Sequence, residues 1–451
     1  MPAYGGEPEN PSCSILFLPE AVRVNNPRDV TVVLPPCNSC TLHRILKVSL
    51  PRSGTTMESA ALSIEFQMSL LLFLALAGYL VASRINQSAT IGAILVGVLV
   101  GPSALGLITY TDFVASLAHL GAIILLFVIG FEFNIKDIVD PRYGVIALLG
   151  VVIPWIGGYF TAVFFGFDFT SAVFIGTALT ATSIAITANV LKEIGVLQIP
   201  AAKAIIGAAV IDDVLSLLVL AVTTDLVVGG DVSVTSVALI LAKSFGFIAV
   251  AGAIGYFAIR KLIQRMDATP LARKYPEFVF IFAMMVAFLY AMFASLVGLS
   301  GIIGAFLAGV AFAGVKLQQS KGVHEGAEYF QIVFASIFFV SLGILADVRA
   351  LTSDMLLFLV ALTLVAIVTK VIGCALPARA MGICREDSLI IGFGMAPRGE
   401  VAMIVALIGL DSGLIGQGVF VTIVLMSLLT TIVTPIVYRN WFFKGAYCAV
   451  E

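Results

Sequence analysis

The sequence predicts an all-α polytopic membrane protein of about thirteen transmembrane helices, built as two inverted six-helix repeats whose broken helices cross at the midplane. Three observations lead to this prediction. Apolar residues make up 60% of the chain and charged residues 12%, whereas soluble domains carry about 25% charged residues. Long apolar runs recur along the chain, and two of them are interrupted at corresponding places.

The apolar runs define the spans, because about 17 residues or more are needed to cross a bilayer as a helix. Polar residues, Gly or Pro separate the runs. There are thirteen of them, at 61–82, 89–109, 114–131, 144–165, 171–189, 202–228, 233–262, 277–296, 299–315, 327–346, 354–380, 387–410 and 417–440. Thirteen divides into six, a connector and six, and a single connecting span inverts the second half relative to the first.

Residues 1–56 differ from the rest of the chain. They are rich in Pro, Asn, Ser and Arg, and they lack the apolar core of a signal peptide. We expect a disordered head there, with Met57 as a second candidate start of translation. Residues 57–440 would then form the membrane domain, and 441–451 a short cytoplasmic tail.

Charge and cysteine content exclude some classes of function. The net charge of −2 and the pI of about 6.0 do not point to nucleic acid. The six cysteines are scattered. Cys37 and Cys40, with His43, offer only one isolated Cys-x-x-Cys pair, which is a weak zinc signal. We expect no cofactor, no structural metal, no nucleic-acid partner and no enzymatic activity.

The basic residues predict the orientation, because loops rich in Lys and Arg stay in the cytoplasm. The connections after odd-numbered spans, together with the C-terminal tail, hold sixteen Lys and Arg residues, and the connections after even-numbered spans hold only Arg349. The sequence therefore predicts a multi-pass protein of the plasma membrane with a cytoplasmic C-terminus. The N-terminal end of the first span would lie outside.

Two adjacent aspartates, Asp212 and Asp213, stand in the middle of the sixth span. A charge near the bilayer centre costs roughly 3 kcal/mol on insertion scales, so buried carboxylates in a span usually serve a function. The alternative is a solvated surface dipeptide, which would need water among about ten apolar-dominated residues on either side.

Spans five and twelve are the interrupted ones. Residues 177–187 of span five are crowded with Thr and Ser, which compete for backbone hydrogen bonds and weaken a helix. Span twelve contains Gly-Met-Ala-Pro397-Arg-Gly, in which Pro397 removes a helix hydrogen bond. Interrupted spans at matching places of two halves predict a transport site between them. A mere proline kink, with threonines bonded to their own backbone, is the alternative.

Depth in the bilayer brings further charges to the same level. At 1.5 Å per residue, Asp212, Lys370 in span eleven and Arg398 in span twelve each lie roughly 15 Å from the cytoplasmic end of their spans. With Asp213 and Glu400 they make a predicted midplane cluster. Arg398 is as suited to bracing the unwound segment as to meeting an ion.

We expect Lys370 to pair with one of the two aspartates, because an unpaired buried charge is far more costly than a paired one. The other carboxylate can hold a proton or a small cation, but not both. If this carboxylate is accessible alternately from each side of the membrane, the competition between the two ions for it produces exchange of cation for proton. Glu132, at the cytoplasmic end of span three, is open to two interpretations: a structural or funnel role, or interfacial exposure.

The motifs resemble one family. Ala-Val-Ile-Asp212-Asp213, Thr-Ala-Thr182-Ser183, Lys370 and Gly-Met-Ala-Pro-Arg398-Gly-Glu400 are together similar to the sodium/proton antiporters of the cation:proton antiporter-2 family, with the NhaA-type fold. The similarity runs from Met57 to the end.

The resemblance implies a homodimer in the lipid bilayer with a core that moves like an elevator. It implies that Asp213 binds the transported Na⁺ or H⁺, with Li⁺ as a further candidate ion, and that Asp212 pairs with Lys370 in the proton-loaded state. Thr182, Ser183 and Glu400 would line the site, and residues 57–440 would comprise a dimerisation part and an ion-carrying core. Members with two aspartates tend to be electrogenic.

Three rival functions remain at this stage. A K⁺/H⁺ antiporter or K⁺ efflux transporter would keep the fold and change the ion. An intramembrane aspartyl protease also buries two aspartates, but it needs them on two different spans around one water. A passive channel could conduct through a charged cavity.

Overall fold

We describe the fold from a computed structural model. It describes residues 22–26, 29–32, 46–49, 64–85, 87–134, 140–228, 234–275, 277–315, 322–346, 349, 351 and 353–443. The side chains of the head strands and of residues 225, 228, 234, 236, 353, 354, 400 and 411 are not described. The chain divides into two units, Met1–Gln67 and Met68–Glu451.

The first unit contains three short strands, β1 (Val22–Asn26), β2 (Asp29–Val32) and β3 (Leu46–Ser49). They pair antiparallel in the order β1-β2-β3. The Cys37 and Cys40 motif lies outside the described residues. The expectation of a disordered head stays a prediction, because most of residues 1–56 are not described.

From residue 64 to 443, every described element is helical, which confirms the prediction of an all-helical membrane domain. Nine helices there are long and apolar enough to cross a membrane, and four shorter apolar helices, Ala89–Val100, Phe169–Ala178, Gly301–Phe312 and Val401–Leu410, accompany them. Each of the thirteen predicted ranges contains helix, but the shorter helices leave the number of spans untested.

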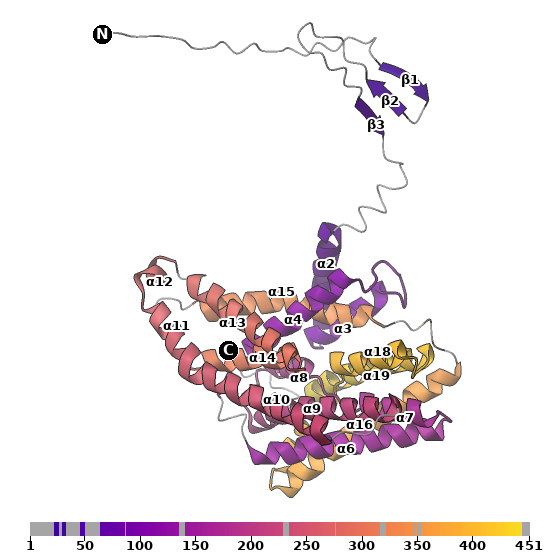
Figure 1. Ribbon diagram of the computed structural model, residues 1–451, viewed down its shortest axis with the longest axis vertical. Coiled ribbons are helices and arrows are strands. Elements are labelled where there is room, and N and C mark those ends of the chain that lie inside the picture. Colours follow the sequence, from indigo (N-terminus) through magenta and orange to yellow (C-terminus); the bar gives the residue numbers. More distant parts are fainter. Residues whose placement is uncertain are drawn as a thin grey trace. The chain divides into compact units, whose positions relative to one another are not determined.

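Six helices pack into one group, which we name the frame (upper part of the helical domain in Figure 1). Within it α3 packs on α15, α4 on both α14 and α15, and α13 on α14. The frame helices are α2 (Ile64–Arg84), α3 (Ala89–Val100), α4 (Asp112–Gly130), α13 (Glu277–Leu296), α14 (Gly301–Phe312) and α15 (Val323–Ile344).

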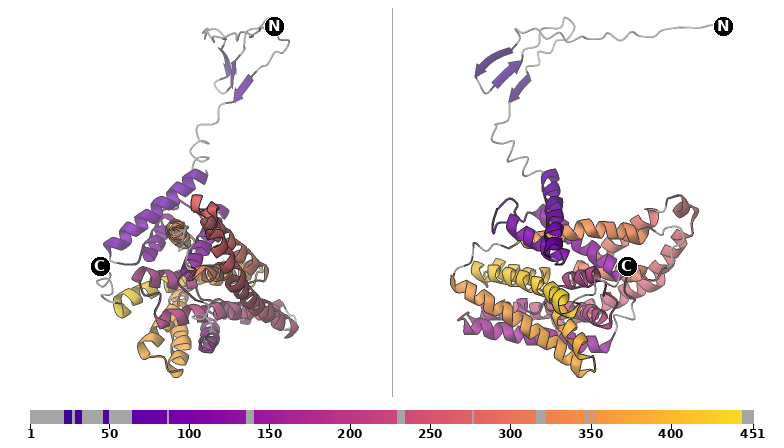
Figure 2. Two further views of the ribbon diagram at one scale, coloured as in Figure 1. Left: turned by 90° about the vertical axis from the view of Figure 1, so that its left-hand side faces the viewer. Right: turned by 180° about the vertical axis from the view of Figure 1, so that it is seen from behind.

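Eight helices form a second group, the core. Here α6 packs on α16, α7 and α9, while α16 packs on α17 and α19. The core helices are α6 (Pro141–Phe164), α7 (Phe169–Ala178), α8 (Ile184–Ile194), α9 (Pro200–Val228), α16 (Ser353–Ala380), α17 (Arg385–Gly394), α18 (Glu400–Asp411) and α19 (Gln417–Val437), which continues into the π-helical turn Tyr438–Phe442. The views of Figure 2 show the same grouping from two other sides.

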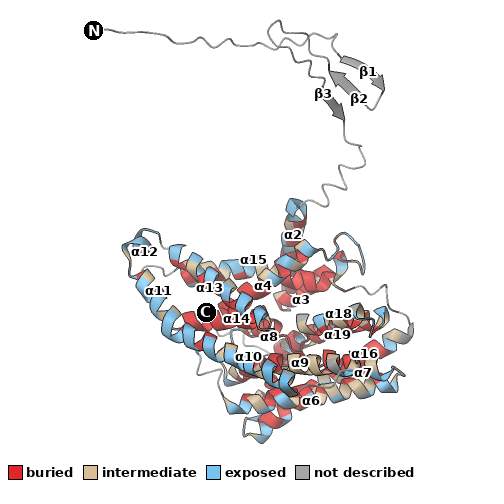
Figure 3. Ribbon diagram, viewed as in Figure 1, coloured by how far each residue is buried: buried red, intermediate tan, exposed pale blue. Residues whose placement is uncertain are grey.

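A long helical connection joins the two halves of the chain. It comprises α10 (Val234–Ile254), the π-helical turn Gly255–Ile259 and α11 (Arg260–Asp267), followed by the short α12 (Pro270–Lys274). This connection passes diagonally across the domain in Figure 1 and is largely exposed in Figure 3, where the buried residues gather on the facing sides of the frame and core.

Glycines let the frame helices approach backbone to backbone. A Cβ atom on Gly97 of α3 would lie 2.2 Å from the carbonyl oxygen of Val340 on α15, and a Cβ on Gly309 of α14 would lie 2.1 Å from that of Phe127 on α4. Real Cβ atoms do not come so close, so no larger residue fits these crossings without a shift of backbone. The two contacts hold the frame tightly together.

Candidate ion-binding site

Two interrupted helices meet at the centre of the core. Helix α7 ends at Ala178 and α8 begins at Ile184, while α17 ends at Gly394 and α18 begins at Glu400. Pro397 lacks the N–H that a helix hydrogen bond needs, which favours a break there, and the hydroxyl-rich segment 179–183 finds partners outside its own helix. The interruptions lie within the stretches that the sequence singles out.

The two interruptions hold each other by hydrogen bonds. The backbone N–H of Ser183 donates to the carbonyl oxygen of Pro397 at 2.9 Å. Thr182 Oγ1 donates to the carbonyl of Met395 at 3.3 Å, and Thr187 Oγ1 to that of Gly394 at 2.6 Å. Backbone groups left open by the breaks are therefore satisfied across the crossing, as buried polar groups must be.

A buried ion pair lies beside the crossing. Lys370 Nζ of α16 is 2.8 Å from Asp212 Oδ1 of α9, and the same ammonium donates to the carbonyl oxygen of Thr180 at 2.8 Å. Asp212 and Lys370 are both fully buried. The carbonyl of Thr180 follows the end of α7, where the helix dipole favours a cation. The ammonium thus has both a counter-charge and a polarised acceptor.

Asp213 faces a different environment. It is 6% exposed and lines a cavity of about 510 Å³. The other walls come from α4, α14, α15, α18 and α19, and they include the polar residues Tyr110, His119, Ser300 and Ser341. The cavity is also lined by Tyr110, Gly298 and Leu345, which lie at or near the ends of the second, eighth and tenth predicted spans. The cavity therefore lies at the end of the bundle where the even-numbered spans finish.

A small pocket joins this carboxylate to the crossing. Asp213, Thr182, Ser183 and Ser300 line it together, and its volume of about 20 Å³ is close to that of one water-sized probe. Oxygen atoms dominate these polar side chains, and hard cations prefer oxygen ligands. The residues present therefore suit a small monovalent cation or a water molecule.

Arg398 is fully buried, but its guanidinium turns to backbone carbonyls. Nη1 is 3.4 Å from the carbonyl oxygen of Met395 and Nη2 is 3.4 Å from that of Ala366. The backbone of Arg398 is held by Thr430 and Thr431 of α19. These contacts match the bracing interpretation of Arg398, since they tie the break after α17 to α16 and α19.

Glu132 lies away from the Asp212–Lys370 pair, whereas the position of the Glu400 side chain is not described. Glu132 follows the end of α4, where its carbonyl oxygen accepts a hydrogen bond from Gln198 Nε2 at 2.6 Å and its carboxylate lies 3.6 Å from His324 Nε2. It is therefore at the opposite end of the bundle from the cavity. Glu400 is the first residue of α18, and its side chain lies outside the described atoms.

Three polar residues of the domain carry no signal in the sequence. His119 is a lone histidine in an apolar run, Ser300 is one hydroxyl before a helix, and Glu193 stands at the end of an ordinary helical segment. Their neighbours come from distant parts of the chain. Ser300, for example, lines the same small pocket as Asp213, which stands 87 positions earlier in the sequence. Only an alignment of related sequences could have drawn attention to them.

The fold and the site together define a class: helical membrane proteins in which two interrupted helices cross beside buried charges. The chain belongs to the sodium/hydrogen exchanger transmembrane family, whose model matches residues 70–444. The matched region holds every predicted site residue.

Individual relatives agree with this assignment. The chain is 35% identical over 384 residues to the Na(+)/H(+)-K(+) antiporter GerN of Bacillus cereus, covering 84% of this chain and 96% of that protein. It is 33% identical over 377 residues to the Na(+)/H(+) antiporter of Enterococcus hirae, covering 81% of this chain and 94% of that protein.

A solved structure shares the fold. The sodium/proton antiporter MjNhaP1 of Methanocaldococcus jannaschii, in its structure at pH 8, has a TM-score of 0.60 at 16% identity, covering 84% of this chain and 97% of that chain. A second structure of the same antiporter has a TM-score of 0.66. These neighbours are of the NhaP type, so the comparison gives no support to the NhaA-type assignment expected from the motifs.

Proposed function

We propose that the protein exchanges Na⁺ for H⁺ across the plasma membrane by alternating access, with Asp213 as the carboxylate that binds either ion. The observation that carries the proposal is the placement of Asp213, which lines both the large cavity and the small pocket at the crossing. The names of GerN and of the Enterococcus hirae antiporter support sodium and proton as the ions.

The two aspartates have separate roles in this proposal. Asp212 keeps Lys370 charged and in place, because each would otherwise be a lone charge in a dry interior. Asp213 projects about 100° away from Asp212 around the same helix, since consecutive helical residues are turned by that angle. Only Asp213 is therefore offered to the cavity.

The chemistry of exchange follows from one carboxylate. Bound H⁺ neutralises Asp213 and removes its attraction for a cation, whereas bound Na⁺ takes the oxygen that a proton would need. Thr182, Ser183 and Ser300 would add oxygen ligands around the ion. Neutralisation of the site by either ion lets the core move through the apolar part of the membrane, and a charged empty site opposes the movement.

We further propose that the domain is a pair of inverted repeats. Six of ten residues are identical between Ser88–Gly97 and Ser300–Gly309. Helices α7 and α17 are each ten residues long, and the breaks 179–183 and 395–399 are each five residues.

Packing supports the same correspondence between halves. The contact of α3 with α15 is matched by that of α14 with α4, and the contact of α6 with α9 by that of α16 with α19. Gly97 and Gly309, which occupy the last place of the aligned segments, both make backbone contacts. An odd connector between such halves inverts one relative to the other.

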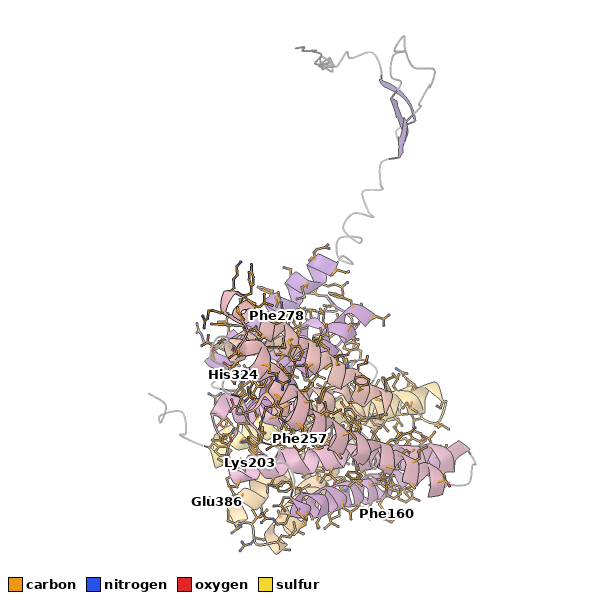
Figure 4. The ribbon with its side chains drawn as sticks, turned by 60° about the vertical axis from the view of Figure 1, so that its left-hand side comes forward. Phe160, Lys203, Phe257, Phe278, His324 and Glu386 are labelled. Carbon is orange, nitrogen blue, oxygen red and sulfur yellow. The ribbon has the colours of Figure 1, made fainter. Side chains whose placement is uncertain are left out.

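The orientation and assembly are also proposals. The distribution of Lys and Arg favours a cytoplasmic C-terminus, and in that orientation the cavity would open to the external face. In Figure 4 the labelled residues His324, Lys203 and Glu386 lie along one edge of the domain, which would be the cytoplasmic edge. A homodimer joined through the frame would leave the core free to move.

Potassium is the second candidate ion. The printed names of the relatives include K⁺ for GerN and for the K(+)/H(+) antiporter subunit KhtU of Bacillus subtilis, to which this chain is 27% identical. An intramembrane protease is disfavoured by geometry, because Asp212 and Asp213 are neighbours on one helix rather than on two.

The test is cation-coupled proton flux in proteoliposomes. A pH-sensitive dye inside the vesicles should report proton movement when Na⁺ or Li⁺ is added outside and a smaller response with K⁺, and clamping the voltage reports the net charge moved. Asp213→Asn should abolish the signal, because it removes both the charge and the titratable proton. Ser116→Ala, on the exposed side of α4, is the control and should retain exchange.

Two outcomes would contradict the proposal. Wild-type exchange in Asp213→Asn would remove that residue from the site. Rapid Na⁺ flux without any proton movement would indicate a channel instead of an exchanger.

A further inference from the structure

Core and frame are joined by polar contacts at the end of the bundle opposite the cavity. Three residues of α8 make them, and their partners lie on α3 and α15. We name the set the α8 latch; it comprises Asn189, Lys192 and Glu193 of the core with Ser88, Thr90, Glu328 and Gln331 of the frame.

One half of the α8 latch is the half-buried carboxylate of Glu193 with its hydroxyl and amide donors. Ser88 Oγ donates to Glu193 Oε2 at 2.5 Å, and Thr90 Oγ1 donates to Glu193 Oε1 at 3.0 Å. Asn189 Nδ2 donates to the same Oε1 at 2.8 Å. Charge-assisted hydrogen bonds of this kind are stronger than neutral ones. Glu193 therefore ties the end of α8 to the beginning of α3.

The other half is a lysine held by α15. Lys192 Nζ is 2.7 Å from Gln331 Oε1 and 3.2 Å from Glu328 Oε1. Gln331 also donates to Asn189 Oδ1 at 3.4 Å, so the two halves share partners. Glu328 lies 3.8 Å from His324, which in turn lies 3.6 Å from Glu132. The contacts thus continue to the end of α4.

Among the described side chains, the corresponding segment of the second half makes no polar contact of this kind with the frame. Helix α18 follows the second interruption as α8 follows the first, and it presents Val401, Met403, Ile404 and Leu407 to the 510 Å³ cavity. Opposite these residues, across the cavity, stand α4, α14 and α15 of the frame. Core and frame are therefore in polar contact at one end and separated at the other.

We infer that the α8 latch is the gate that holds the protein in the conformation in which Asp213 faces the cavity, and that it must open before the site can face the other side. The inference rests on the proposed alternating access. Opening separates the half-buried carboxylate of Glu193 from its donors Ser88 and Thr90, while closing at the opposite end brings the apolar cavity-lining residues of α18 against the frame. The imbalance favours the cavity-open conformation in the absence of ions.

The test measures the conformation directly, without transport. Leu407→Cys places a thiol in the wall of the cavity, at a residue that is 47% exposed. It is introduced into the full chain with Cys13, Cys37, Cys40, Cys384 and Cys448 replaced by Ser, so that the buried Cys374 is the one native thiol left. In the intact latch, a membrane-impermeant maleimide should label Leu407→Cys rapidly. Glu193→Gln or Lys192→Glu should slow the labelling several-fold, because the cavity closes when the latch is weakened.

A double variant that swaps the charges of Lys192 and Glu328 distinguishes an effect on the gate from misfolding. Lys192→Glu and Glu328→Lys each place like charges together, and the double variant restores an opposite pair. Labelling of Leu407→Cys should return to the starting rate in the double variant. Glu325→Gln, an exposed change on the first turn of α15 outside the latch, is the matched control and should leave the rate unchanged.

The transport assay completes the test. Latch variants should change the KM for Na⁺ in opposite directions on the two faces of the membrane, whereas loss of structure would lower the rate on both. Unchanged labelling in both Glu193→Gln and Lys192→Glu, or a double variant no better than the singles, would overturn the inference and leave the exchange proposal intact. Absence of exchange in the wild type would overturn the exchange proposal, while the labelling would still report the gate.

Discussion

Replacement of Lys370 by Met should lower stability by about 3–5 kcal/mol. Lys370 has no accessible surface and contacts Asp212 and the carbonyl of Thr180, both at 2.8 Å. Methionine fills a similar volume, so little cavity forms, but Asp212 is left as a buried carboxylate without its cation. Breaking a buried pair from one side costs about 3–5 kcal/mol.

The measurement is thermal unfolding of the purified protein in detergent. With the unfolding entropy that globular proteins of this length show, the loss corresponds to a fall of roughly 3–5 °C in melting temperature. The double variant Asp212→Asn with Lys370→Met removes both charges and should regain most of the lost stability, because no lone charge remains. Lys243→Met, at an exposed residue of α10, is the control and should change stability by less than about 0.5 kcal/mol.

The double variant decides the reasoning. Should it be as unstable as Lys370→Met alone, the loss would come from packing and hydrogen bonding rather than from an uncompensated charge. In that case the coupling between the two residues, taken from the double-mutant cycle, would be near zero. A single variant Lys370→Met as stable as the wild type would refute the argument outright.

Two further predictions concern the scaffold of the site. Gly97→Ala should destabilise the protein by about 1–3 kcal/mol, because its Cβ would meet the Val340 carbonyl at 2.2 Å, whereas Gly144→Ala, where a Cβ meets nothing within 4 Å, should be neutral or stabilising; equal melting temperatures would contradict this. Thr187→Val should cost about 1–3 kcal/mol and slow exchange, because the Gly394 carbonyl loses its 2.6 Å donor at the crossing. Thr161→Val, whose hydroxyl bonds only within its own helix, is the control for equilibrium unfolding and should show a smaller loss.

The interruptions of the helices could be predicted from local sequence. Proline, glycine and clustered hydroxyl residues change backbone preference wherever they stand, so the weak segments around Thr182 and Pro397 carry their own signal. Depth could also be predicted, because the rise per residue of a helix is constant. It placed Asp212 and Lys370 at one level, and the two residues are in contact.

The direction of each side chain around its helix could not be predicted. The rise per residue of a helix gives the depth of Arg398 in the bilayer. It does not give the direction of the side chain, which packing turns toward the carbonyls of Met395 and Ala366. The α8 latch was missed for a related reason. Glu193 and Ser88 are 105 residues apart, and neither stands in a recognisable motif. Contacts of this range depend on how whole helices are placed.

The glycine contacts of the frame restrict how the molecule can move. Where α3 crosses α15 and α4 crosses α14, main chain rests on main chain, and no long side chains lie between them to change rotamer and allow sliding. Such backbone contacts resist sliding of one helix along the other, so the six helices of the frame should behave as one rigid body in the lipid. A movement that carries a cation across the bilayer must then be a movement of the core, with its interrupted helices, relative to this rigid frame.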